Sequence, residues 1–213
     1  MLSHWVTLMS GQEIRETYLE AGDYFVSVVD SIEIDLFDAP ALGEWCVRDL
    51  VGHTYRSFTT VLSYSAVPSN KVDFERPVDY FLRLLSSDVN HGHIAERGRA
   101  AGLEIIEDPK MMVRGFAMYV KNKLEELSDD HIMGTLTGGM RLIDYLPTRT
   151  FELIIHTMDL TKALGVESSP PRRGMETTLQ MIGQLALNRG YAQELILAST
   201  GRDGLARGFT VLS

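Results

Sequence analysis

The residue types and spacing that favour chemistry are concentrated in the segment 148–164. Apolar side chains cover one side of this segment and much of the other: Phe151, Ile154, Ile155 and Met158, then Leu153, Leu160 and Leu164. Such a pattern predicts a buried helix. Glu152 and His156 interrupt it and, being four residues apart, project from the same face. Because a buried carboxylate is costly unless it is paired or binds a metal, the two residues are candidate metal ligands.

His53 is the third candidate ligand, on the flank of the apolar stripe of a second predicted helix, 47–64. If the two helices face each other in a bundle, the chain supplies two imidazoles and one carboxylate. That set suits zinc, with a fourth position open to water or substrate. From spacing alone a simpler interpretation is stronger, with Glu152 and His156 as a surface pair and His53 as an ordinary core histidine.

Two charged neighbours on the segment 148–164 have open roles. Arg149 lies one turn before Glu152 and either holds that carboxylate or binds a carboxylate of the substrate. Asp159 lies three residues after His156. It either orients the imidazole or forms a surface pair with Lys162.

Three residues near the start of the second helix also accompany His53. Asp49 lies one turn before His53 and either holds its second nitrogen or, as the preferred interpretation, favours the positive end of the helix dipole. The thiol of Cys46 lies at a helix N-terminus, which lowers thiol pKa values. It is roughly 10 Å along the axis from His53, too far to share a metal, so we expect a buried small residue. Trp45 is expected to pack at the helix entry.

The elements that must position these residues are mainly helices. Apolar periodicity, with capping and breaking residues, predicts helices at 11–31, 47–64, 78–85, 91–102, 109–127, 148–164 and 175–188. Four of them are long, which favours a bundle with additional short helices. The glycine-rich segment 134–139 is predicted to be a loop, and 195–202 and 209–212 to be short strands.

The expected fold class is therefore all-α dominated, a four-helix bundle with a small C-terminal α/β extension. We expect one metal-binding bundle at 1–166 and an extension at 167–213 that packs on it. The boundary is placed just before the linker Ser168-Ser-Pro-Pro171.

Composition excludes several classes of function. The 213 residues are 45% hydrophobic and 23% charged, which is typical of a globular protein. Acidic residues outnumber basic ones by 29 to 20, and the net charge of −9 disfavours binding to nucleic acids and to anionic membranes. No apolar run approaches the ~20 residues of a membrane span. With a single cysteine and no signal-peptide pattern at the N-terminus, a cytoplasmic protein is expected.

Two blocks of the sequence carry a resemblance to a known family. The block 43–53, GEWCVRDLVGH, contains a Trp-x-Val-x-Asp-Leu-x-x-His pattern. The block 149–165, RTFELIIHTMDLTKALG, contains an Arg-x-x-Glu-x-x-x-His-x-x-Asp pattern. In order and separation they resemble the metal-binding domain of the mycothiol-dependent maleylpyruvate isomerases, within the DinB-like superfamily. The segment 198–202, ASTGR, also resembles the C-terminal part of family members.

This resemblance implies that His53, Glu152 and His156 are metal ligands, and it reverses the preference drawn from spacing alone. It further implies a DinB-like four-helix bundle, a divalent metal that is usually zinc, a low-molecular-weight thiol such as mycothiol as co-substrate, and a possible homodimer. Two features depart from the family. Cys46 stands where Ser or Thr is frequent, and the isomerases carry a larger C-terminal domain than the segment 172–213.

The expected function is a metal-dependent enzyme in which a thiol attacks an electrophilic substrate, either as a maleylpyruvate isomerase-like or as a thiol S-transferase-like protein. Arg149 would orient an acidic substrate. One alternative is a non-catalytic DinB-like metal-binding or stress-associated protein, whose metal is structural. A weaker alternative is a metal-dependent hydrolase, for which the sequence nominates no carboxylate to assist the attacking water.

Overall fold

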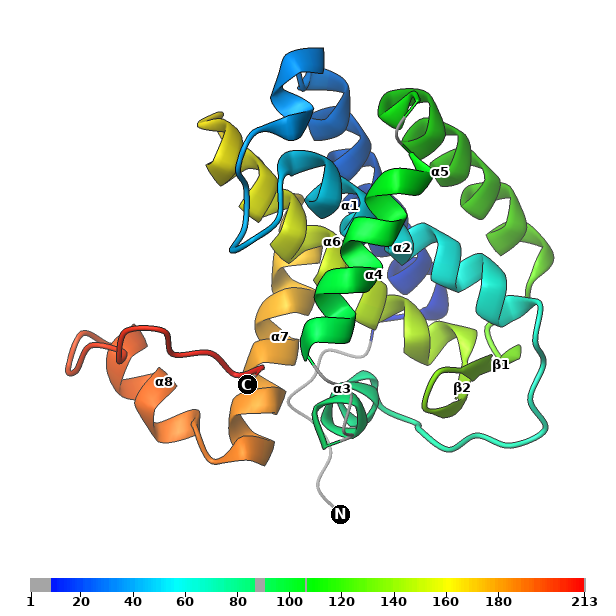
Figure 1. Cartoon of the computed structure of the whole chain (residues 1–213). Coiled ribbons are helices and arrows are strands. Elements are labelled where there is room, and N and C mark those ends of the chain that lie inside the picture. The colour runs from blue at the N-terminus through cyan, green and yellow to red at the C-terminus, as the bar shows by residue number, and fades with distance from the viewer. Residues whose placement is uncertain (1–8, 87–90, 106, 213) are drawn as a thin grey trace.

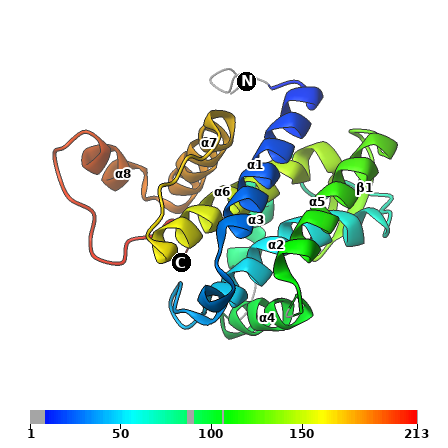
Figure 2. The same cartoon turned by 90° about the horizontal axis from the view of Figure 1, so that it is seen from above.

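Four long helices form a bundle in the computed structural model, which describes residues 9–86, 91–105 and 107–212 (Figure 1). They are α1 (Gly11–Ser31), α2 (Val47–Ser65), α5 (Pro109–Glu126) and α6 (Leu142–Leu164). Helix α1 packs against α5 and α6, and α2 packs against the same two helices. Figure 2 shows the four from above. The predicted all-α bundle is confirmed.

Smaller elements surround the bundle. They are the 3-10 helix η1 (Ile34–Asp38), α3 (Pro77–Ser86), α4 (His91–Glu104), β1 (Ile132–Thr135), β2 (Gly138–Arg141), α7 (Arg172–Arg189) and α8 (Ala192–Ser199). Helix α4 packs along α2, whereas α3 and α7 pack on α6. Helix α8 contacts α7 and lies on its outer side (Figure 1).

The predicted position of the strands was wrong. The segment expected to hold a strand at 195–202 forms most of α8, and turns follow it. An apolar run as short as LILA fits either a strand or a helix, so local pattern cannot decide. The described strands are instead β1 and β2, an antiparallel hairpin that spans the predicted loop 134–139 and extends beyond it on both sides. Met133 and Met140 pair across it and are fully buried, which stabilises a glycine-rich hairpin.

Helix α6 begins earlier than predicted, at Leu142 rather than near Thr148, and therefore includes Pro147. A proline inside a helix costs about 3 kcal/mol because it removes one backbone hydrogen bond and crowds the preceding turn. Leu142, Tyr145 and Leu146 on this first part of α6 are fully buried. Burial of each side chain contributes about 1.5–3 kcal/mol, which offsets the proline.

The helices that carry the candidate ligands have defined ends. Helix α2 starts after Cys46, whose backbone N–H and thiol both donate to Oδ2 of Asp49, at 3.1 and 3.2 Å. Helix α6 ends at Gly165, which adopts a left-handed conformation with φ of 66° that suits glycine. The start of α2 fixes the position of His53 along that helix, and the end of α6 fixes the positions of Glu152 and His156.

The apolar interior forms two clusters. The main one fills the space between the four long helices and includes Tyr18, Phe25, Leu50, Phe58 and Leu153. The second joins α3, α6 and α7 with the end of the chain, and its buried members are Val78, Phe81, Phe151, Met181, Leu185, Ala186 and Val211. The C-terminal segment is thus packed on the bundle. None of the helices in the described ranges is long and apolar enough to cross a membrane.

Candidate metal centre

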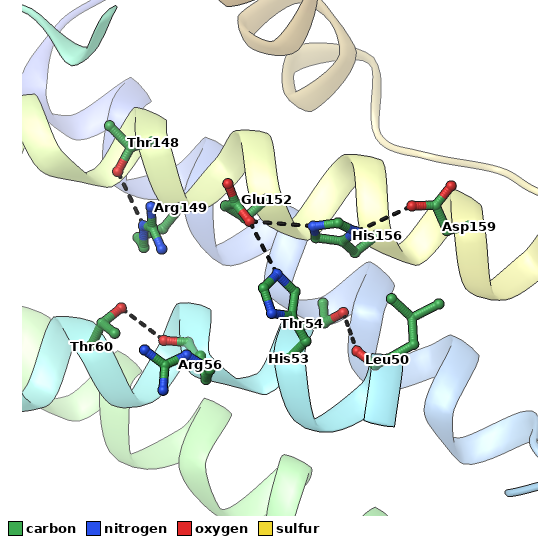
Figure 3. Close-up of polar contacts among 10 residues, drawn as sticks. All are labelled: Leu50, His53, Thr54, Arg56, Thr60, Thr148, Arg149, Glu152, His156 and Asp159. Carbon is green, nitrogen blue, oxygen red and sulfur yellow. Dashed lines mark hydrogen bonds and ion pairs between the residues drawn. The ribbon is translucent and has the colours of Figure 1, made fainter. Parts of the chain in front are cut away.

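Helices α2 and α6 bring His53, Glu152 and His156 together. The two helices run in opposite directions, and His53 faces the turn of α6 that carries the other two residues (Figure 3). Nε2 of His53 lies 3.6 Å from Oε2 of Glu152, and Nε2 of His156 lies 3.3 Å from the same oxygen. One ligand atom from each residue lies within 4.8 Å of the others. The three predicted ligands therefore form one cluster.

The donor set and its spacing fit zinc. Bonds of about 2.0–2.1 Å to nitrogen and oxygen place tetrahedral ligands about 3.3 Å apart, close to the separations between Glu152 and the two histidines. The side chains of His53, Glu152 and His156 keep 15, 20 and 18% of their surface exposed. Among the described residues the cluster contains no fourth protein ligand. Three ligands with solvent access are typical of an open, catalytic type of site.

In the metal-free cluster Glu152 and His53 have the charge states that metal ligands need, whereas His156 must lose a proton. Burial tends to raise the pKa of Glu152, but hydrogen bonds to His156 and His53 and the charge of Arg149 hold it well below its usual value. Burial lowers the pKa of His53, and the positive charge of Arg56 adds to this effect. Burial acts in the same direction on His156, yet Asp159 and Glu152 raise its pKa to about 9. Glu152 is thus ionised and His53 neutral.

The two histidines are held in different ways. Nδ1 of His156 lies 3.1 Å from Oδ2 of Asp159, so Asp159 contacts the imidazole, the first of its two predicted roles. The ring of His53 lies against that of Trp45, with centroids 4.7 Å apart. Nδ1 of His53 is buried and has no hydrogen-bond partner among the described residues. Asp49 caps α2 instead, which agrees with the preferred interpretation of that residue.

Arg149 lies beside the cluster and is buried. Its Nε donates to Oγ1 of Thr148 at 3.1 Å, and its guanidinium group lies over the rings of Tyr145 and Tyr80, 5.0 and 5.9 Å from their centroids. It makes no ion pair with Glu152 within 4 Å. Its charge nevertheless helps to keep the pKa of Glu152 low.

Other residues with chemical potential lie outside the cluster. Cys46 is partly exposed rather than buried, and burial together with Asp49 raises the pKa of its thiol, which disfavours a nucleophilic thiolate. Nε2 of His131 lies 3.0 Å from the carbonyl oxygen of Ser65. His4 and the side chains of His91 and His93 lie outside the described residues, and 91–93 begin α4, in agreement with the predicted helix 91–102.

The sequence patterns missed Arg56, which lies one turn after His53 on α2 (Figure 3) and whose positive charge lowers the pKa of His53. The signal that finds it is the spacing of three residues from a ligand, which places both side chains on one face. Helical spacing does not predict the ring contact between Trp45 and His53. Trp45 lies before α2, so its position depends on the path of that non-helical segment.

The described fold is similar to that of a solved structure, the mycothiol-dependent maleylpyruvate isomerase. The superposition has a TM-score of 0.58 and covers 84% of this chain and 70% of that chain, with 13% sequence identity. No family profile matches the sequence, and no curated protein matches it. At this identity the likeness shows a shared fold. The chain therefore has the helical fold of that isomerase.

Proposed function

We propose that this protein is a metal-dependent enzyme, with zinc as the metal, that uses a low-molecular-weight thiol such as mycothiol. The reaction is the isomerisation or the S-transfer of an electrophilic substrate. One observation carries the proposal: His53, Glu152 and His156 offer ligand atoms within 4.8 Å of one another and remain partly exposed. The fold shared with a mycothiol-dependent isomerase supports the thiol.

Each residue of the site has a role in this proposal. His53, Glu152 and His156 hold the ion, and Asp159 orients His156. A bound zinc ion lowers the pKa of a coordinated thiol and so supplies a thiolate at neutral pH. Arg149 places a positive charge beside the site and favours an acidic substrate. Its planar guanidinium group suits a carboxylate.

The role of the thiol separates the two reactions. In an isomerisation the thiolate sulfur adds to one carbon of a cis double bond, the remaining single bond rotates, and the same carbon–sulfur bond then breaks. The thiol is regenerated. In an S-transfer the carbon–sulfur bond persists. In an addition the neighbouring carbon then takes up a proton, and in a substitution a leaving group departs with its bonding electron pair.

The test is a calorimetric titration of mycothiol into the zinc-loaded protein, in two buffers with different ionisation enthalpies. We expect one thiol to bind and one proton to be released, because the bound form is the thiolate. The matched ligand is the S-methyl derivative, which has no thiol proton and should release none. Zinc binding without thiol binding would contradict the proposal and favour a structural metal or a hydrolase.

A further inference from the structure

A groove of about 350 Å³ lies between α1 and α5, whereas the metal centre lies between α2 and α6. Its apolar lining includes Leu19, Val26, Phe58 and Ala117. Phe58 is buried at the floor, and the other three are half-buried. Met118 on the rim is 63% exposed. The groove therefore presents apolar side chains to solvent, a feature typical of an interaction surface.

The two helices that form the walls of the groove run antiparallel. Arg114 near the start of α5 pairs with Asp30 near the end of α1, at 2.7 Å. Arg15 near the start of α1 donates to the carbonyl oxygen of Leu124 near the end of α5. These two contacts fix which residues of α1 and α5 lie at the same level along the groove.

The two walls carry opposite charge. Helix α1 contains five acidic residues and one basic residue, whereas α5 contains four basic residues and two acidic ones. Glu16, Asp23 and Asp30 recur every seven residues along α1, and Arg114 and Lys121 are seven apart on α5. Seven residues make nearly two helical turns, so each set lies along one side of its helix.

Asp23 and Lys121 are the charges on the rim that have no partner within the described ranges. Both line the groove and are exposed, and neither makes an ion pair there. Arg114, which also lines the groove, already pairs with Asp30. The rim thus offers one acidic and one basic group of opposite sign on facing walls.

We propose that this groove is the interface of a homodimer, in which it packs against the same groove of a second copy of the chain. The two copies are related by a two-fold axis that runs along the groove. Rotation about this axis places α1 of each copy over α5 of the other, at the same level along the helices. Asp23 of each copy then faces Lys121 of the other, and Met118 of each copy covers the apolar lining of the other.

The charges favour a second copy over other occupants. The net charge of −9 opposes the approach of two copies through most of their surface. The groove is different, because a two-fold axis brings its acidic wall against the basic wall of the other copy twice. A partner of one charge sign would match one wall and be repelled by the other.

The test is sedimentation equilibrium of the full chain over a range of concentrations. We expect the parent to dimerise. Lys121→Glu should raise the dimer dissociation constant by about 100-fold or more, because it sets like charges against Asp23 at two equivalent places. Lys123→Glu is the matched control and should leave dimerisation unchanged. It alters the net charge equally, but Lys123 pairs with Glu126 and does not line the groove.

Exchange of the two charges tests the pairing itself. Asp23→Lys alone should also be monomeric, whereas an equimolar mixture of Asp23→Lys and Lys121→Glu should form a heterodimer with both ion pairs restored. Circular dichroism spectra of the variants should match that of the parent, because both positions are exposed. Unchanged dimerisation of Lys121→Glu, or a mixture that stays monomeric, would overturn the inference. A monomeric parent would also overturn it and leave the groove to a different occupant.

Discussion

Asp159 and His156 form a contact one turn apart on α6, with Oδ2 of Asp159 3.1 Å from Nδ1 of His156. The contact occupies the ring nitrogen that faces away from Glu152, and it leaves Nε2 turned toward that carboxylate. His53 has no equivalent partner among the described residues, and its ring lies against Trp45. One imidazole is thus oriented by a charge and the other by packing.

Replacement of Asp159 should weaken metal binding without abolishing it. In Asp159→Asn the carboxylate that orients His156 and raises its basicity is lost, so we expect zinc affinity to fall about 10- to 100-fold. Competition with a chromogenic chelator measures the change. Asp49→Asn is the matched control, since Asp49 caps α2 and does not contact the cluster. A larger loss of affinity in Asp49→Asn than in Asp159→Asn would contradict this assignment.

Zinc binding should release a proton from His156. Its pKa is raised to about 9 in the metal-free protein, so the imidazole is protonated at pH 7.5, whereas a metal ligand must be neutral. Since Glu152 is already ionised and His53 neutral, about one proton is expected per zinc at pH 7.5. The apparent affinity should rise with pH and level off above about pH 9. Calorimetry in buffers of different ionisation enthalpy tests this, and no proton release at pH 7.5 would refute it.

Gly52 should not tolerate a side chain. It precedes His53 on α2, and a Cβ at this position would collide with the backbone of Ala101 and Gly102 on α4. Gly52→Ala should therefore displace α4 and destabilise the protein by about 1–3 kcal/mol, as expected for overpacking. Chemical denaturation measures the free energy of unfolding. Gly183→Ala is the control, because nothing lies within 4 Å of its added Cβ, and it should be neutral or slightly stabilising.

The extension at 167–213 should contribute to stability and not to metal binding. Leu185 on α7 is fully buried in the second apolar cluster. Leu185→Ala should lower the free energy of unfolding by about 2–5 kcal/mol, the range for a buried leucine. Zinc stoichiometry should not change. Leu187→Ala is the matched control, because Leu187 is 70% exposed and its loss should cost less than about 0.5 kcal/mol. Equal destabilisation by both variants would argue against this packing.

Periodicity predicted the bundle because the long helices each bury one apolar stripe. The predicted range 11–31 coincides with α1, where Ser10 and Glu13 form a complete capping box. Prediction was weaker where local preference and packing disagree. Pro147 marks a helix start by local rules, yet buried residues on both sides of it continue α6. The hairpin of β1 and β2 depends on two methionines that meet only across strands.

The candidate site was predictable for similar reasons. Spacing placed Glu152 and His156 on one face of a buried helix. The order and separation of the sequence blocks 43–53 and 149–165 added His53. Spacing did not predict how His53 is held, because Trp45 reaches it from the segment before α2.

Zinc content of the purified protein and of His156→Ala tests the central claim most directly. Elemental analysis of the parent protein after zinc loading and desalting should give one zinc per chain. His156→Ala should retain none, whereas His131→Ala should retain one, because His131 contacts the Ser65 carbonyl and lies outside the cluster. Stoichiometric zinc in His156→Ala, or none in the parent, would contradict the proposed centre.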